Sequence, residues 1–368
     1  MNDHDLIYQI AFSLIRGNNR VVAEELLNKV GSEEHFFTTS TRMLEMQIGQ
    51  KVKYADEEYR KKLIIKAQYE IEFIKRNNIT PLYFKDSRYP QRLSDCDDAP
   101  IMLYSLGDCN LNTSHIIGIV GTRHATHYGT EQTERIVEEL AAKLDNVIIV
   151  SGLAYGIDIT AHRAAIKHNI PTIAVLAHGL NTIYPAAHRN IAAEMVKHNG
   201  MLITDYTSTD NIHRGNFLAR NRIVAGLCDC ILISESAEKG GAIVTAKIAD
   251  GYNRDVLALP GRASDIYSKG CNKLIASGRA ALVSSAQDII ETMRWSEKPQ
   301  EGTQQEMFTP QSEEEEFVIK YISNNPLSSI NEISIGTNIT LSKLSSILID
   351  LEFQGIITNY PGGRYDIS

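Results

Sequence analysis

The middle of this chain alternates short apolar runs with longer amphipathic stretches, and this pattern restricts its possible folds more than any other feature. The runs are rich in Val and Ile and lie at 116–120, 147–150, 172–176, 201–204, 230–234, 255–259 and 280–283. The stretches between them carry apolar residues at helical spacing, at 130–144, 158–169, 188–199, 217–227, 241–252 and 271–277. Continuous apolar strands separated by helices are typical of a parallel sheet buried on both faces. The expected fold class is therefore α/β, with a Rossmann-like, doubly wound and mainly parallel sheet.

Two smaller domains are expected beside this sheet. Residues 1–80 carry apolar residues at helical spacing around a Gly-Asn-Asn turn, which indicates a helical domain, either a plain bundle or a helix-hairpin-helix (SAM-like) module. The Rossmann-like domain is expected over 81–295, followed by a linker at 296–312 that is rich in Gln, Glu and Pro. Residues 313–368 predict short helices followed by a Gly-rich hairpin, which is the layout of a winged-helix domain.

The net charge of −8 argues against nucleic acid as a partner, but the acidic residues are unevenly distributed. Residues 112–292 carry 17 basic and 17 acidic side chains, whereas residues 313–368 carry 3 basic and 8 acidic ones. A basic surface on the central domain therefore depends on local clustering. The recognition helix of the expected winged helix holds one Lys and two carboxylates, which favours a protein-contact or regulatory role over DNA binding.

Several classes of protein are disfavoured by what the sequence lacks. No run approaches 18 apolar residues and the N-terminus has no basic signal sequence, so we expect a cytoplasmic protein without membrane association. The five Cys are scattered and odd in number, which favours reduced thiols over disulfides or a zinc site. No GxGxxG follows the first strand, and neither GxxxxGK[ST] nor HExxH occurs. We therefore expect no cofactor and no metal.

The candidate binding residues follow the apolar runs. Ligands of an open parallel sheet bind beyond the carboxyl ends of the strands, where loops lead into helix N-termini. Here those loops carry glycines, which let the backbone approach an anion closely, and several basic side chains. Many such loops at one edge suit a polyanion better than a single phosphate. The candidates are Gly121, Thr122, Arg123, Ser151, Gly152, Arg220, Asn221, Arg222, Gly240, Gly241, Thr245 and Lys247, with Arg262 as a further candidate cation.

Catalysis has less support in the sequence than binding. Glu235 at a strand end and Asp158 at a helix start could act as acid or base, but carboxylates in such places are more often ion-pair members or helix caps. Ser151 lacks the G-x-S-x-G context of a nucleophile. No catalytic residue is assigned, and the loops are expected to bind rather than to react.

The same loops also carry a set of motifs in a fixed order. They are GTR (121–123), SGLAYGID (151–158), AH (161–162), YP (184–185), RNRIVAGL (220–227), GGAIVTA (240–246), LPG (259–261) and SKGCNKLIASG (268–278). Together they resemble the DNA-processing protein A family, also called DprA or Smf. The resemblance covers the whole middle domain, and the helical start and the PGGRY wing fit the three-part layout of the family.

The resemblance implies a non-enzymatic protein that binds single-stranded DNA. Members of the family protect incoming DNA during natural transformation and load the RecA recombinase on it, displacing the block of the single-strand-binding protein. They act as homodimers through the Rossmann domain. DNA, RecA, the single-strand-binding protein and a second copy of the chain are therefore the expected partners.

The family also implies roles for particular residues. Arg123 would contact the DNA backbone, and the Arg-Asn-Arg run at 220–222 would line the same pocket, partly as phosphate ligands and partly as braces. Gly152 and Gly241 would present backbone N–H groups. Phe217 would stack on a base, which tolerates any sequence.

This chain departs from the family at two of these loops. Members often have Arg where it has Tyr155, and Ser where it has Gly241. The loss of one cation would either weaken the site or shift the contact to Lys247 or Arg214.

Two other functions remain open at this point. A related Rossmann architecture hydrolyses nucleoside monophosphates with a PGGxGTxxE motif, whereas this chain has LPGRASD and GGAIVTA without the glutamate-bearing motif. A transcription factor that reads duplex DNA with the winged helix is the other alternative, and the acidic recognition helix argues against it.

Overall fold

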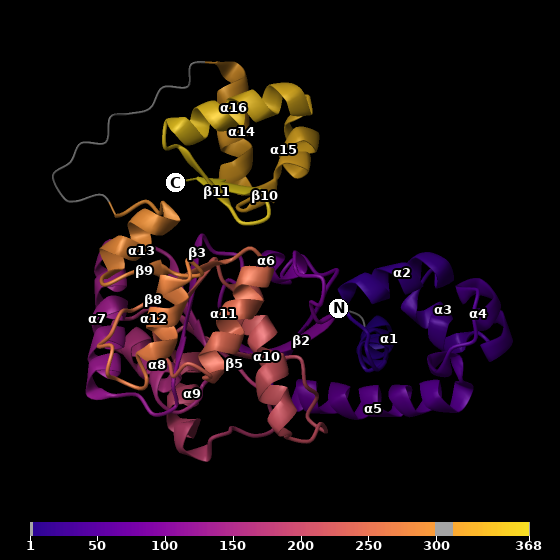
Figure 1. Ribbon diagram of the computed structural model, residues 1–368. Helices are drawn as coiled ribbons and strands as arrows, with labels where there is room; N and C mark the ends of the chain where they lie inside the picture. The colour runs from indigo at the N-terminus through magenta and orange to yellow at the C-terminus, as the bar shows by residue number, and fades with distance from the viewer. Residues whose placement is uncertain (1–2, 299–311, 368) are drawn as a thin grey trace.

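The computed structural model of the chain describes residues 3–298 and 312–367. A helical part at the N-terminus, a central α/β part and a small C-terminal part follow one another along the chain (Figure 1). The N-terminal helices lie beside the central sheet, and the C-terminal part lies above it in this view. Within the described ranges, no helix is long and apolar enough to cross a membrane.

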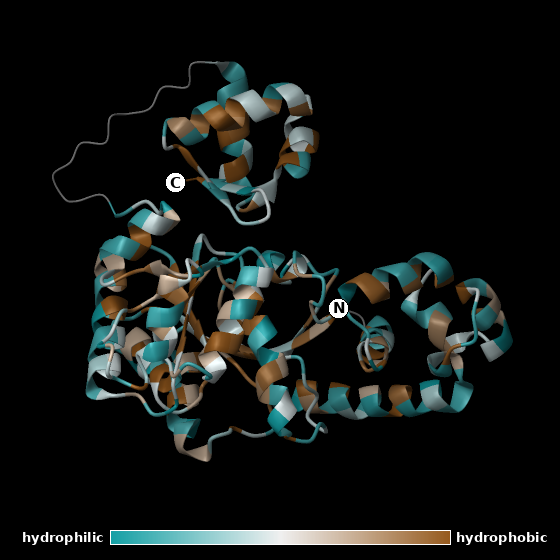
Figure 2. Cartoon of the chain, viewed as in Figure 1, coloured by the Kyte–Doolittle hydropathy of each residue, from teal (hydrophilic) through white to brown (hydrophobic). Residues whose placement is uncertain are grey.

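The N-terminal part packs its helices around one apolar core, in which Phe12, Phe36 and Leu44 are fully buried. The helices are α1 (Asp3–Ser13), α2 (Arg20–Val30), α3 (Glu33–Thr38), α4 (Thr41–Ile48) and α5 (Glu57–Arg76), with the 3-10 helix η1 (Lys53–Ala55) before α5. The long helix α5 alternates hydrophobic and hydrophilic turns, as expected for a helix with one buried face (Figure 2).

The turn before α2 bears on the helix-hairpin-helix alternative. Asn19 caps the helix, and its side-chain oxygen accepts a hydrogen bond from the N–H of Val22 at 3.0 Å. The N–H of Arg20 donates to the carbonyl oxygen of Ala99 at 3.0 Å. Both donors have protein acceptors and are not available to a phosphate. The helix-hairpin-helix assignment stays a prediction.

The central part is built on a nine-stranded sheet in the order β1-β2-β6-β5-β4-β3-β7-β8-β9. Its strands are β1 (Thr80–Tyr83), β2 (Met102–Gly107), β3 (His115–Gly121), β4 (Val147–Ser151), β5 (Thr172–Val175), β6 (Met201–Thr204), β7 (Cys230–Glu235), β8 (Asp255–Ala258) and β9 (Ala281–Leu282). Strands β3 to β9 pair in parallel, whereas β1 and β2 form an antiparallel edge next to β6. The predicted Rossmann-like, mainly parallel sheet is confirmed, and its strand order reverses at β3, between β4 and β7.

Helices cover both faces of the sheet because successive side chains of a strand point to opposite faces. Ile116 packs on one face with α6 (Gln91–Ser94), α10 (Arg214–Leu227), α11 (Gly241–Gly251) and α12 (Lys269–Ala276). Ile117 packs on the other face with α7 (His127–Lys143), α8 (Ile157–Lys167) and α13 (Ala286–Met293). The 3-10 helix η2 (Ala186–His188) leads into α9 (Arg189–Lys197), whose Met195 is buried against β6.

The C-terminal part has its own apolar core and a three-stranded antiparallel sheet in the order β10-β12-β11. Its elements are α14 (Glu313–Asn324), β10 (Ser328–Ser329), α15 (Ile330–Thr337), α16 (Leu341–Phe353), β11 (Ile357–Tyr360) and β12 (Arg364–Ile367). This order of helices and strands is compatible with a winged helix, an assignment that stays a prediction. The division of the chain at residues 80, 295 and 312 stays a proposal, and most of the predicted linker, 296–312, lies outside the described residues.

The C-terminal part rests on the central part through its strands. The guanidinium of Arg364 donates to the Asp95 carboxylate at 3.1 and 3.2 Å. Tyr360 and Leu327 are buried in the core cluster of the α7 face, and the guanidinium of Arg92 lies 5.7 Å from the centre of the Tyr360 ring. The strands thus face the central part, and α16 lies on the far side (Figure 1).

Candidate functional site

A pocket of about 260 Å³, the strand-end pocket, opens at the carboxyl ends of β3, β4 and β7, on the face that α10 and α11 cover. It lies where the strand order reverses, which is where open α/β sheets bind ligands. Ten of the thirteen residues proposed from the sequence line it: Gly121, Thr122, Arg123, Gly152, Phe217, Arg220, Asn221, Gly240, Gly241 and Thr245. The remaining three, Ser151, Arg222 and Lys247, are not part of its lining.

Arg220 lies under the floor of this pocket as a buried brace. Only 4% of its surface is exposed, and its guanidinium donates to the carbonyl oxygen of Val175. Burial lowers the pKa of Arg220, while the nearby Asp158 carboxylate raises it. The Asp158 carboxylate in turn accepts hydrogen bonds from the backbone N–H groups of Gly152 at 3.1 Å and Ala154 at 3.3 Å. This buried pair holds the loop after β4 against α10.

Gly152 shows why that loop needs a residue without a side chain. A Cβ atom there would lie 2.1 Å from a terminal nitrogen of the Arg220 guanidinium. A Cβ at Gly241, by contrast, would meet nothing within 4 Å. The two pocket glycines therefore differ: the first makes room for the brace, and the second leaves the start of α11 open to a ligand.

Arg123 and Phe217 form the mouth of the pocket. The guanidinium of Arg123 lies over the Phe217 ring, 5.5 Å from its centre. Phe217 also meets the edge of the Tyr184 ring at a centroid distance of 5.6 Å. Arg123 is exposed and has no carboxylate partner in the described part of the chain. A cation stacked on a half-exposed aromatic ring can meet a phosphate and a base of one strand.

Three candidate side chains point away from the pocket because of their positions within a strand or a helix. The Ser151 hydroxyl is buried in β4 and donates to the carbonyl oxygen of Ile119 at 2.6 Å. Arg222 is paired with the Asp205 carboxylate at 2.7 Å. Lys247 is exposed on α11, two residues beyond the pocket-lining Thr245. Arg222 therefore has a structural role through its ion pair with Asp205. Lys247 has no ion-pair partner among the described residues and lies on the surface beside the pocket.

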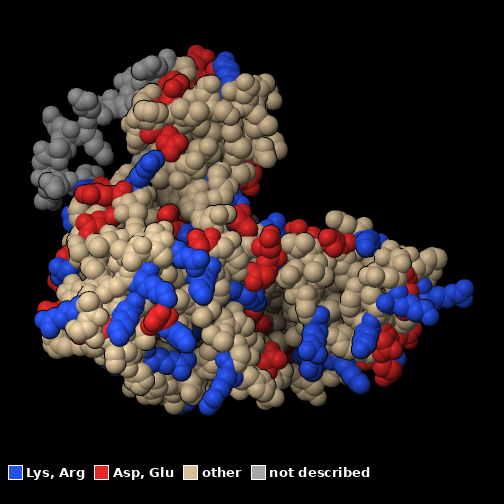
Figure 3. Space-filling model, in the orientation of Figure 1, with Lys and Arg blue, Asp and Glu red and all other residues tan. Residues whose placement is uncertain are grey.

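Lys and Arg gather on that neighbouring surface. Figure 3 shows basic side chains over the face that α10, α11 and α12 cover, with few acidic ones among them. The exposed basic residues of α11, α12 and the loops beside them are Lys239, Lys247, Arg262, Lys269, Lys273 and Arg279, of which Lys273 is paired with Glu238 at 2.5 Å. The central segment is neutral as a whole, but its basic side chains are clustered on the surface next to the pocket.

Neither carboxylate considered for acid–base chemistry is free. Glu235 is buried at the end of β7, and its two oxygens accept hydrogen bonds from the hydroxyl of Thr126 at 2.7 Å and the N–H of Thr126 at 2.9 Å. It thereby fixes the residue that caps α7. Asp158 serves the brace described above. All five cysteines are unpaired, and no group of His, Cys, Asp and Glu that could hold a metal occurs among the described residues.

Sequence reasoning missed several residues of the lining. They are mostly apolar: Val120, Ala154, Leu218, Val224, Ala237 and Ala242. Ala154, Val224 and Ala242 lie inside the quoted motifs, so the motifs signal their place, but their small apolar side chains give no chemical signal of their own. Leu218, which is 53% exposed beside Phe217, was detectable only through its neighbour.

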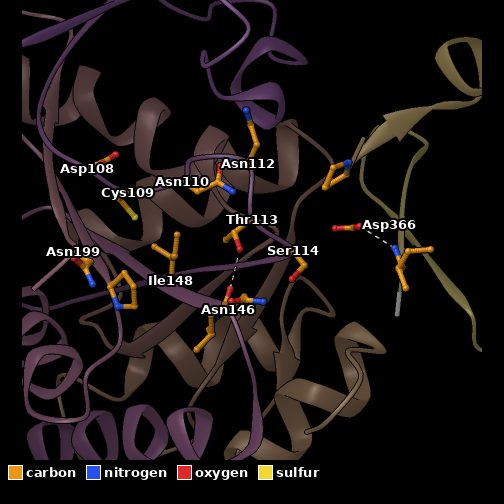
Figure 4. Close-up of a pocket in the computed structure, with 14 residues that line it drawn as sticks. Asp108, Cys109, Asn110, Asn112, Thr113, Ser114, Asn146, Ile148, Asn199 and Asp366 are labelled. Atoms are coloured by element: carbon orange, nitrogen blue, oxygen red, sulfur yellow. Dashed lines mark hydrogen bonds between the residues drawn. The ribbon is translucent and has the colours of Figure 1, made fainter. Parts of the chain in front are cut away.

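Another pocket lies at the opposite edge of the sheet, at the amino ends of the strands, and none of the candidate residues lines it. Figure 4 shows it between the amino ends of β3 and β4 and the C-terminal strands, lined by amide and hydroxyl side chains such as Asn112, Thr113 and Asn146. Its charged lining residues are the carboxylates Asp108 and Asp366, without any Lys or Arg. This pocket is therefore unsuited to a polyanion.

The fold and the strand-end pocket together define a class of protein: a doubly wound α/β protein whose loops suit an extended anionic ligand. Residues 80–294 match the family of DNA recombination-mediator protein A. Protein Smf of Synechocystis sp. is 31% identical over 339 residues, which cover 79% of this chain and 84% of the relative. DNA processing protein DprA of Streptococcus pneumoniae is 36% identical over 205 residues, which cover 56% and 71%. The chain belongs to the DNA recombination-mediator protein A family, and the resemblance noted in its motifs is confirmed.

Two solved structures of the family share this fold. The X-ray structure of DNA processing protein A from Streptococcus pneumoniae has a TM-score of 0.63 at 27% identity, covering 79% of this chain and 98% of that one. The protein from Helicobacter pylori has a TM-score of 0.52 at 31% identity, covering 59% and 95%. The Helicobacter structure was determined to describe a single-stranded DNA binding mode.

Proposed function

We propose that this chain binds single-stranded DNA in the strand-end pocket and delivers it to the RecA recombinase. The observation that carries the proposal is the contact between Arg123 and the Phe217 ring at the mouth of a glycine-lined pocket. Among the described residues, Arg123 has no ion-pair partner. A phosphate and a stacked base are the two features that every nucleotide of a single strand offers, whatever its sequence.

The surroundings of the pocket support a long ligand rather than a mononucleotide. The exposed lysines of α11 and α12 continue the positive charge beyond the pocket. A strand that runs across this surface would release counterions at each contact, which accounts for binding by a protein of net charge −8. The structure of the Helicobacter pylori relative, described with single-stranded DNA, supports the same ligand class.

A binding role also fits the carboxylates of the site better than a hydrolytic one. Asp158 and Glu235 both accept hydrogen bonds from the protein itself. A nucleoside hydrolase would need one of them free to face the sugar. We propose that the chain has no enzymatic activity of its own and acts as a homodimer through the central part, with RecA and the single-strand-binding protein as its partners.

The test uses a fluorescent oligo-dT strand of a few tens of nucleotides, titrated with the protein and followed by anisotropy. Wild type should bind this strand more tightly than duplex of the same length. Phe217→Ala should weaken binding about tenfold, because stacking contributes about 1–3 kcal/mol per base. Phe353→Ala is the matched control, since Phe353 is 91% exposed on the distant α16, and its affinity should equal wild type. Equal affinities of all three proteins would contradict the assignment of the pocket.

A second readout addresses delivery to the recombinase. RecA filament assembly would be followed on a strand coated with the single-strand-binding protein. Wild type should accelerate assembly and Phe217→Ala should not. Acceleration that is independent of Phe217 would separate recombinase loading from this pocket.

A further inference from the structure

A second cavity adjoins the strand-end pocket at the same edge of the sheet. It has a volume of about 740 Å³ and is lined by Thr126, Tyr128, Pro260, Arg262 and their neighbours. The loop from β3 to α7 borders both cavities, because its Thr122 and Arg123 line the strand-end pocket while Thr126 lines the second cavity. The two cavities lie on opposite faces of the sheet, one beside α10 and α11 and the other beside the start of α7.

The walls of the second cavity combine an aromatic ring with a free cation. The Tyr128 ring is 42% exposed at the cavity wall, and its hydroxyl donates to the carbonyl oxygen of Pro260 at 2.7 Å. Arg262 is exposed and has no ion-pair partner among the described residues. Asp265 also lines the cavity, and its carboxylate accepts a hydrogen bond from the Ser264 hydroxyl at 3.3 Å.

A stacked pair of rings lies between the two cavities. His124, in the loop from β3 to α7, stacks on Tyr267, in the loop from β8 to α12, with ring centres 6.2 Å apart and planes 28° apart. Arg123 stands next to this pair in the chain. The loop that borders both cavities therefore carries a cation at the strand-end pocket and an aromatic pair one residue further along the chain.

We propose that the second cavity is a subsite for a neighbouring nucleotide of the same single strand, with a base stacked on Tyr128 and a phosphate facing Arg262. The strand crosses the carboxyl edge of the sheet over the loop of residues 122–126. This inference rests on the proposed function and adds to it the path of the strand. Stacking platforms with cations at their rims are how sequence-tolerant proteins track a single strand.

The test compares oligo-dT strands of increasing length, because only a strand long enough to reach both cavities can use the subsite. Tyr128→Ala should weaken the binding of long strands about tenfold and leave the shortest strand that still binds unaffected. Tyr128→Phe keeps the ring and should bind like wild type. Arg262→Ala should reduce the dependence of affinity on salt by about one phosphate contact, on long strands only. Tyr69→Ala is the control, because Tyr69 is 65% exposed on α5 and lines neither cavity.

A spectroscopic readout separates stacking from a change in folding. A strand carrying 2-aminopurine should show quenched fluorescence on wild type and on Tyr128→Phe, and lose part of the quenching on Tyr128→Ala. The subsite is refuted if Tyr128→Ala and Arg262→Ala bind long strands like wild type while Phe217→Ala does not; the proposed function then stands. It is also refuted if Tyr128→Phe fails as Tyr128→Ala does, since the hydroxyl rather than the ring would matter. If wild type binds no single strand of any length, the proposed function and the subsite both fail.

Discussion

Arg123, in the loop after β3, and Arg220, in α10, line the same pocket, yet their surroundings give them different roles. Arg220 is buried, its guanidinium donates to the carbonyl oxygen of Val175, and the nearby Asp158 carboxylate favours its charged form. Arg123 is exposed, and its guanidinium lies over the Phe217 ring. Removing a buried partner leaves an uncompensated charge, whereas removing an exposed cation leaves the fold unchanged. The sequence names both arginines as candidates, but burial cannot be read from the residue type.

The pocket glycines provide a prediction at this scale. Gly152→Ala should lower both stability and DNA affinity, because the new methyl group meets the Arg220 guanidinium. Gly241→Ala should leave both nearly unchanged, because the space around its Cβ position is open. Urea unfolding and anisotropy on the same preparations check both properties. Equal behaviour of the two variants would contradict the packing described for the brace.

At the scale of elements, apolar periodicity predicts the strands and long helices of the central part to within a few residues. It does not reveal α3, α4, α6 or α13, which have four to eight residues and so offer few turns in which a period can be seen, although the same pattern predicts α12, which also has eight residues. Helix geometry also explains why the Arg-Asn-Arg run could not line the pocket as a unit. Consecutive helix residues point about 100° apart, so Arg222 leaves the pocket and pairs with Asp205 instead. The same rotation takes Lys247 away from Thr245.

The contact between α8 and β5 makes stability depend on pH. The buried His162 lies 2.7 Å from the Thr172 hydroxyl, which itself donates to the carbonyl oxygen of Ile149. His162 therefore donates from Nδ1, and burial lowers the pKa of His162 from 6.5 to about 3. Between these two values the unfolded chain binds a proton that the folded chain does not, so the contribution of His162 to stability falls as the pH falls.

His162→Gln should remove this dependence. Urea unfolding at several pH values from about 5 to about 7 should give a free energy of unfolding that depends less steeply on pH in the variant. One group can contribute a difference in slope of at most about 1.4 kcal/mol per pH unit. Parallel curves for the two proteins would show that His162 is protonated in the folded chain.

At the scale of the whole molecule, the C-terminal part and the strand-end pocket lie at opposite edges of the sheet. The C-terminal part is held by Arg364 and Asp95 and by the buried Tyr360, next to the amino ends of the strands. Its helix α16 faces away and exposes Ile349 and Phe353, and its one Lys, Lys343, is paired with the Glu314 carboxylate at 2.7 Å. The acidic charge that the sequence places in this segment is therefore kept away from the DNA surface, which reconciles the overall charge with the proposed ligand.

Arg364→Ala should loosen this attachment without affecting the DNA site. Losing hydrogen bonds between charged groups should lower the free energy of unfolding by about 1–3 kcal/mol. Hydrogen exchange should speed up in β10 to β12 and around Asp95, while affinity for oligo-dT stays at the wild-type value. Arg76→Ala is the matched control, because Arg76 and Glu72 form an exposed pair on α5 that contributes little. Loss of DNA affinity in Arg364→Ala would place the C-terminal part within the DNA site.

The most direct test of the central claim is the salt dependence of binding to oligo-dT. The logarithm of the affinity is measured against the logarithm of the salt concentration for wild type, Arg123→Ala and the control Arg76→Ala. If Arg123 neutralises a phosphate, its removal should lower the affinity and reduce the slope by about 0.7, the value for one contact on a single strand. Arg76→Ala should reproduce the wild-type slope. An Arg123→Ala line that coincides with wild type in slope and height would contradict the proposal that the strand-end pocket binds DNA.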